Sequence, residues 1–155
     1  MEQYQRVKGR TLRAVILAAG ESSRMGRPKL LLPWDEDTIL GTTIKNAQEG
    51  GLKDLTVITG AYQNQVAAIA AAKDVPCLHN PDYATGQSSS LRTALVSGEA
   101  SQQGIMFILG DQPLVKPAVY RSLQKAYQKS VAWLVAPQGP TERRGNPVIV
   151  APELF

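Results

Sequence analysis

The sequence predicts an α/β fold with a mostly parallel sheet. Two of its segments are continuous apolar runs, interrupted only by Arg13: Leu12 to Ala18 and Ile105 to Leu109. Such runs are typical of strands that are buried on both faces, as in a parallel sheet covered by helices. Short apolar runs, which predict strands, alternate along the chain with segments whose apolar residues are spaced as in a helix. This alternation is the pattern of βαβ units. The length of 155 residues suits one domain with its own core.

The first half of the chain predicts three strands and two helices. After the first strand, glycines and prolines between positions 20 and 34 indicate a loop. Thr38 can cap a helix that continues to about Glu49, and Gly50 and Gly51 end it. The elements that follow are a strand at 55–59, an alanine-rich helix at 62–72 and a short strand at 75–79.

The second half predicts two helices and three strands. A helix at 88–100 starts at Ser88, which can cap it, and Pro117 suits the first turn of a helix at 117–129. Tyr120 and Tyr127 lie two helical turns apart and are expected to be partly buried. The predicted strands lie at 105–109, 131–136 and 147–150.

Composition excludes several classes of protein. The formal charge is +4, but the basic residues are dispersed and aromatics are only 6% of the chain, so we expect no nucleic-acid partner. No apolar run is long enough to span a bilayer, and the polar start of the chain is not a secretory signal. The single cysteine, Cys77, lies in an apolar strand, where we expect a buried thiol in a cytoplasmic protein.

The loop after the first strand combines residues that suit a polyphosphate. Gly20 and Gly26 let backbone amides approach phosphate oxygens, and Arg24 and Lys29 supply positive charge. The spacing fits neither a Walker A loop nor a G-x-G-x-x-G fingerprint. On these residues alone, an ordinary surface loop explains the pattern equally well. The loop and Asp111 each follow an apolar strand, so they can share one crevice at the carboxyl edge of the sheet.

Four motifs resemble a known family. The run from Leu17 to Pro33, LAAGESSRMGRPKLLLP, is similar to the signature of the MobA-like nucleotidyltransferases. Three further segments match in order, GQSSSL at 86–91, GDQP at 110–113 and RGNP at 144–147. Guanylyl-transferring relatives usually carry Ala-Gly-Gly and Asp-Lys in the first motif. This chain carries Ala-Ala-Gly and Pro-Lys, like the molybdenum cofactor cytidylyltransferase branch.

The resemblance implies a fold and a reaction. The fold would be a Rossmann-like three-layer sandwich of the nucleotide-diphospho-sugar transferase type. The reaction would be the Mg²⁺-dependent transfer of CMP from CTP to the phosphate of a molybdopterin-type cofactor, with release of pyrophosphate. Implied protein partners are a molybdenum hydroxylase or its chaperone.

The resemblance also implies residue roles. Arg24 and Lys29 would be catalytic, and Asp111 would hold the metal, although without the resemblance Asp111 is better explained as a turn residue. Arg144 and Asn146 would bind the acceptor. The expected nucleotide-binding residues are Leu17, Ala18, Ala19, Gly20, Gly26, Gly86, Ser88 and Ser89.

Two alternative functions remain open at this stage. Related enzymes usually supply a second acidic ligand from a segment beyond the equivalent of Phe155, so we expect residues 1–155 to form one domain that lacks its C-terminal end. One alternative is a nucleotidyltransferase for another phosphorylated acceptor, such as a sugar or alcohol phosphate. The other is a non-catalytic accessory protein that binds nucleotide or cofactor for a molybdenum enzyme.

Overall fold

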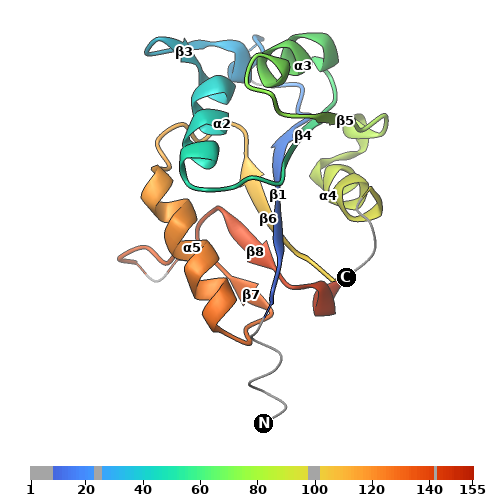
Figure 1. Ribbon diagram of the computed structural model, residues 1–155. Helices are drawn as coiled ribbons and strands as arrows, with labels where there is room; N and C mark the ends of the chain where they lie inside the picture. The colour runs from blue at the N-terminus through green and yellow to red at the C-terminus, as the bar shows by residue number, and fades with distance from the viewer. Residues whose placement is uncertain (1–8, 23–25, 98–101, 142) are drawn as a thin grey trace.

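A six-stranded sheet forms the centre of the computed structural model, which describes residues 9–22, 26–97, 102–141 and 143–155. The strand order is β5-β4-β1-β6-β8-β7 (Figure 1). The first four of these strands are parallel, and β8 is antiparallel to both of its neighbours. The strands are β1 (Leu12–Ala18), β4 (Leu55–Thr59), β5 (Cys77–His79), β6 (Gly104–Leu109), β7 (Leu134–Val135) and β8 (Val148–Val150). The mostly parallel sheet is therefore confirmed.

Helices cover both faces of this sheet. They are α2 (Ile39–Glu49), α3 (Gln63–Ala71), α4 (Gln87–Val96) and α5 (Pro117–Lys129). Side chains of α2, α3 and α5 share the larger hydrophobic cluster, whereas Ala94 of α4 belongs to a smaller cluster on the opposite face. Figure 1 shows α2 and α5 on one side of the strands and α4 on the other. The result is the expected three-layer arrangement.

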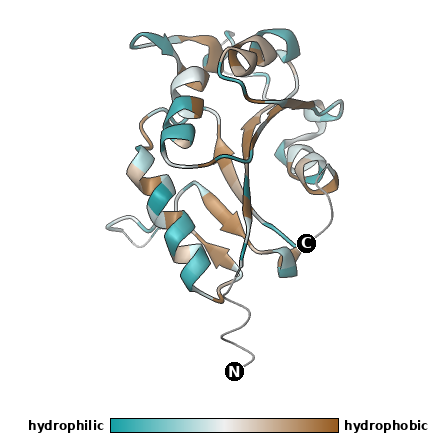
Figure 2. Cartoon of the chain, in the orientation of Figure 1, coloured by the Kyte–Doolittle hydropathy of each residue, from teal (hydrophilic) through white to brown (hydrophobic). Residues whose placement is uncertain are grey.

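The strands are apolar because they are buried between these layers. In β1, Ile16 contributes to the larger cluster and Val15 to the smaller one, and each is at most 2% exposed. Figure 2 shows strands coloured as hydrophobic while much of the helical surface is hydrophilic. Burying an aliphatic side chain of this size stabilises the fold by about 1.5–3 kcal/mol. This explains why the two continuous apolar runs identified their strands.

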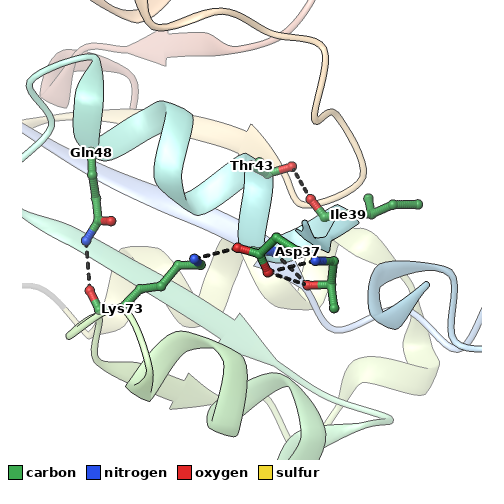
Figure 3. Close-up of polar contacts among 7 residues, drawn as sticks. Asp37, Ile39, Thr43, Gln48 and Lys73 are labelled. Atoms are coloured by element: carbon green, nitrogen blue, oxygen red, sulfur yellow. Dashed lines mark hydrogen bonds and ion pairs between the residues drawn. The ribbon is translucent and has the colours of Figure 1, made fainter. Parts of the chain in front are cut away.

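Helix α2 is anchored at both ends to the residue Lys73, which follows α3. Lys73 Nζ lies 2.6 Å from Asp37 Oδ2 at the start of α2, and Gln48 Nε2 donates to the Lys73 carbonyl at 2.8 Å (Figure 3). Partial burial alone would raise the pKa of Asp37, but hydrogen bonds from Lys73 and Thr38 lower it. Thr38 caps the helix as expected, with its hydroxyl accepting from the Gly41 amide at 3.0 Å. These contacts fix the position of α2.

Some elements differ from the sequence prediction. Two short strands, β2 (Pro33–Trp34) and β3 (Asp37–Thr38), form a separate hairpin where a plain loop was expected. The strands expected at 75–79 and 131–136 are shorter, and α4 ends at Val96, with positions 98–101 outside the described residues. The prediction of a buried Cys77 is wrong, because β5 is an edge strand and leaves this residue exposed. None of the described helices is long and apolar enough to cross a membrane.

Candidate functional site

One cavity of about 450 Å³ is surrounded by the loops that follow β1, β5 and β6 and by the 3₁₀ turn η1 (Lys29–Leu31). We call it the glycine-loop cavity, because Gly20, Gly86 and Gly110 line it together with Lys29 and Asp111. The carboxyl ends of parallel strands lie at the same edge of a sheet, which is where ligands bind in α/β folds. The sheet topology therefore brings together loops that are far apart in the sequence.

Lys29 and Asp111 form an ion pair in this cavity. Lys29 Nζ lies 3.1 Å from Asp111 Oδ2, and the Lys29 amide donates to Ser22 Oγ at 3.2 Å. The two side chains are 42% and 39% exposed, so both remain accessible to a ligand. A lysine beside a carboxylate offers positive charge to phosphate oxygens and an oxygen ligand to a metal ion.

Helix α2 supports the loop that carries Asp111. Thr43 is fully buried, and its hydroxyl lies 3.1 Å from the Gly110 carbonyl and 2.9 Å from that of Ile39. Asn46 Nδ2 lies 2.9 Å from the Pro113 carbonyl and 3.1 Å from that of Val115. Because α2 is itself anchored to Lys73, the bonds from Thr43 and Asn46 hold the loop after β6 in a fixed position.

A second cavity, of about 650 Å³, adjoins the first. Lys29 and Asp111 line both cavities. Two molecules that each occupied one cavity would therefore meet beside Lys29 and Asp111. We call the second one the apolar cavity, because its walls include Trp34, Ile39 and Leu114. Gln112 also lines it, and its side-chain Oε1 is buried without a hydrogen-bond partner in the described part of the chain. Two cavities that meet at charged groups suit a reaction between two substrates.

The start of α4 forms the opposite end of the glycine-loop cavity. Gly86 precedes the helix with a φ of +117°, a conformation that glycine adopts without strain. Gln87 and Ser90 line the cavity, whereas Ser88 is exposed outside its lining. Ser89 is 7% exposed and lies 2.8 Å from Asn80 Nδ2. This end therefore offers an amide and a hydroxyl in place of charged groups.

The structure brings most of the residues that sequence reasoning selected into these two cavities. The glycine-loop cavity contains Leu17, Ala18, Ala19, Gly20, Lys29, Gly86 and Asp111. The apolar cavity contains Asn146 in addition to the shared pair. Arg24 falls outside the described residues, so the structure gives no position for it.

Other selected residues lie elsewhere. Gly26 is exposed and does not line either cavity, and neither do Ser88 and Ser89. Arg144 lines a separate cavity with Leu134 to Ala136 and with Gln138, to which it is joined by an isolated antiparallel bridge. Arg144 is thus not brought together with Lys29 and Asp111.

Several lining residues were not among the expected nucleotide-binding residues, although Gln87 and Ser90 belong to the GQSSSL motif. Tyr83, Gln87 and Ser90 line the glycine-loop cavity, and Trp34 lines the apolar one. The turn-forming Asn80-Pro81 pair before Tyr83 was a usable signal, since it shows that the chain reverses at the carboxyl end of β5.

A magnesium ion fits the carboxylate present. Within the described residues there is no cluster of three or more histidine, cysteine, aspartate or glutamate side chains. Asp111 is the one acidic residue found in the described lining of either cavity. Mg²⁺ commonly binds through one or two carboxylates together with substrate phosphates and water, so a single aspartate beside a phosphate site is compatible with it.

Comparison with known proteins identifies relatives. The family described as the MobA-like NTP transferase domain matches residues 14–155. Molybdenum cofactor cytidylyltransferase of Escherichia coli is 37% identical over 111 residues, which are 70% of this chain and 56% of that protein. Nicotine blue oxidoreductase of Paenarthrobacter nicotinovorans is 28% identical over 144 residues, covering 88% of this chain and 69% of that protein. The chain thus spans little more than half the length of the Escherichia coli relative.

Solved structures agree with the fold. Rv0371c of Mycobacterium tuberculosis superposes with a TM-score of 0.81 at 30% identity, covering 96% of this chain and 75% of the other. The same protein has been crystallised with manganese, and that structure superposes with a TM-score of 0.78.

Proposed function

Since the chain belongs to the MobA-like NTP transferase family, we propose that it transfers CMP from CTP to the phosphate of a molybdopterin-type cofactor, releasing pyrophosphate. The observation that carries the proposal is the meeting of two cavities at Lys29 and Asp111. Similarity to the Escherichia coli cytidylyltransferase supports the choice of nucleotide and acceptor.

In this proposal CTP occupies the glycine-loop cavity. The backbone from Ala18 to Gly20 borders the nucleobase, and the Lys29 ammonium neutralises the charge that grows at the α-phosphate. The acceptor phosphate attacks the α-phosphorus in line, and a new P–O bond forms as the bond to pyrophosphate breaks. No covalent intermediate with the protein is needed, so the chain contributes positioning and charge neutralisation.

Asp111 holds Mg²⁺ in this proposal. The ion would neutralise charge on the nucleotide phosphates and on the departing pyrophosphate. Asp111 is paired with Lys29 at 3.1 Å, which keeps the carboxylate at the junction of the two cavities. The existence of a manganese complex of the Mycobacterium tuberculosis relative supports a divalent ion in this fold. The backbone bonds from Thr43 and Asn46 keep the loop that carries Asp111 in place.

The apolar cavity is the proposed site of the acceptor. Trp34, Ile39 and Leu114 offer apolar walls to a flat ring system. Asn146 can bind a polar substituent at the same cavity, whereas Arg144 is assigned no contact with the acceptor here.

The nucleotide preference is tested by calorimetric titration. CTP and GTP, each with Mg²⁺, are titrated separately into the protein, and CTP is expected to bind more tightly. A preference for GTP would contradict the assignment of the cytidylyl branch. This experiment measures binding alone, so it is informative whether or not residues beyond Phe155 are needed for turnover.

Another phosphorylated acceptor is the second candidate function. A sugar phosphate or alcohol phosphate would meet the same Lys29 and Asp111, but it would leave the walls formed by Trp34 and Leu114 without an apolar partner. Pyrophosphate release is therefore compared between the molybdopterin-type cofactor and a panel of such phosphates. Faster release with a sugar or alcohol phosphate would replace the proposed acceptor and leave the proposed CTP site intact.

A further inference from the structure

Asn80 lies at the carboxyl end of β5 and is 1% exposed. Its side-chain Nδ2 is 2.8 Å from Ser89 Oγ and 3.0 Å from Ser90 Oγ, and its Oδ1 accepts from the Asp82 amide at 3.0 Å. The Asn80 amide itself donates to the Thr59 carbonyl at 2.9 Å. Buried polar groups are costly unless they are paired, and here every polar group of the side chain has a partner.

The hydrogens of this network can be assigned one by one. An asparagine side chain has two N–H donors, and both are used on serine oxygens. The Ser89 hydroxyl uses its own hydrogen on the Gly86 carbonyl at 2.7 Å. Ser90 accepts from Asn80, and no acceptor within the described part of the chain takes the Ser90 hydrogen. That hydrogen is therefore left for a ligand.

Ser90 lines the glycine-loop cavity while remaining 4% exposed. The strand order β5-β4-β1-β6 separates the end of β5, where Asn80 lies, from the end of β6, where Asp111 lies. If the triphosphate lies near Lys29 and Asp111, the nucleobase lies toward Gly86 and Ser90. The donor is thus presented at the end of the cavity that lacks charged side chains.

We propose that Asn80 is a positioning residue, which holds the Ser90 hydroxyl as a hydrogen-bond donor to the carbonyl oxygen of a nucleobase in the glycine-loop cavity. The inference rests on the proposed function, because it assumes a nucleotide in this cavity. Cytosine has one carbonyl oxygen, so it offers one acceptor of this kind. Asn80 acts through Ser90 and makes no contact with the nucleotide itself.

Replacing Asn80 by aspartate reverses the direction of these bonds. An ionised carboxylate only accepts hydrogen bonds, so the Ser89 and Ser90 hydroxyls would both turn to donate to it. The Ser90 hydrogen would then be withdrawn from the ligand, although the residue at position 80 keeps its size. Ser90→Ala removes the same donor and leaves the bonds from Asn80 to Ser89 and Asp82 in place.

The test is a double-mutant cycle read by calorimetric titration of CTP with Mg²⁺. Asn80→Asp and Ser90→Ala are each expected to weaken binding about tenfold, as for loss of one hydrogen bond. The double variant should be no weaker than either single variant, because both changes remove the same donor. Ser97→Ala, at the far end of α4 and outside this cavity, is the matched control and should bind like the unmodified chain.

A second titration separates positioning from a general structural effect. A CTP analogue whose base lacks the carbonyl oxygen should bind the unmodified chain about tenfold more weakly than CTP, and Ser90→Ala should not weaken it further. Additive losses in the cycle would overturn the inference. Equal losses for CTP and the analogue in Ser90→Ala would also overturn it, and this comparison does not depend on the folding of Asn80→Asp. If the unmodified chain binds CTP and neither variant changes binding, this inference alone is wrong. If the unmodified chain binds no nucleotide, the proposed function fails with it.

Discussion

The Lys29 ammonium and the Asp111 carboxylate lie 3.1 Å apart, although 82 positions separate them in the sequence. Lys29 begins a 3₁₀ turn after the β1 loop, and Asp111 follows β6. Because β1 and β6 are parallel neighbours, their carboxyl ends bring the two loops together at one edge of the sheet. The pair links the two cavities, and the proposed reaction depends on both of its members.

Replacing Lys29 by alanine should reduce turnover by more than about a hundredfold. Loss of one charged contact in a transition state costs ~3 kcal/mol, which corresponds to that factor. Pyrophosphate release under saturating CTP measures the effect. Lys45→Ala, an exposed change on α2 away from both cavities, is the control and should retain the rate. An unchanged rate in Lys29→Ala would remove Lys29 from the mechanism.

Replacing Asp111 by asparagine should weaken metal binding. The amide keeps the size of the side chain but lacks the negative charge that holds a divalent cation. We expect the Mg²⁺ concentration needed for half-maximal pyrophosphate release to rise at least about tenfold, as for the loss of ~1.4 kcal/mol of binding. Asp35→Asn is a matched control, since Asp35 lies exposed in the β2–β3 turn with a φ of +51° that asparagine tolerates. An Mg²⁺ requirement that is the same in both variants would exclude Asp111 as the ligand.

Gly60 permits the close packing behind the glycine-loop cavity. A Cβ atom at this position would collide with the Ala19 carbonyl and would lie 2.7 Å from the Tyr83 Cβ, both in segments that border the cavity. Gly60→Ala should therefore lower the free energy of unfolding by about 1–3 kcal/mol, the usual cost of overpacking. Urea denaturation measures this. Gly139→Ala, where the nearest atom would be 3.9 Å away, is expected to have no such cost, and equal losses would contradict the packing argument.

Tyr120 should make stability depend on alkaline pH. Burial raises its pKa from 10.0 to about 12, and its hydroxyl has no hydrogen-bond partner within the described part of the chain. Because the folded-state pKa is the higher one, this contribution to stability is complete below pH 10 and is lost as the pH rises toward 12. Tyr120→Phe should remove that part of the loss and should leave stability at neutral pH unchanged or higher.

Urea denaturation at neutral pH and between pH 10 and 12 checks this expectation. Burial also raises the pKa of Tyr127, so the alkaline loss should become smaller in Tyr120→Phe without disappearing. A variant that loses stability at neutral pH, or that shows the full alkaline loss, would contradict the account of Tyr120.

The layers of the fold could be predicted because their signals are local. Apart from Arg13 near the start of β1, the residues of β1 and β6 are apolar, since helices cover both faces of the sheet. The β2–β3 hairpin could not be predicted in this way, because strands of two residues have no periodicity to detect. The exposure of Cys77 depends on β5 being at the edge, which is a property of the strand order and is absent from the local sequence.

The part of the candidate site that could be predicted consists of residues in the loops that follow correctly predicted strands. Gly20, Lys29 and Asp111 follow strands whose positions were correct, so these residues meet in the structure. The serine motif was different, because sequence reasoning placed the helix cap at Ser88 and the structure places it at Gly86. Each residue turns a helix by about 100°, so a small shift of the start changes which serine faces the cavity. Ser90 faces it, and Ser88 is exposed.

Pyrophosphate release is the measurement that tests the central claim most directly. The protein is incubated with Mg²⁺, the reduced molybdopterin-type cofactor and either CTP or GTP, and pyrophosphate and the dinucleotide product are quantified together. The account predicts equal amounts of pyrophosphate and cytosine dinucleotide cofactor from CTP, and far less product from GTP. Faster reaction with GTP, or no product from a protein extended to the full length of its relatives, would contradict it.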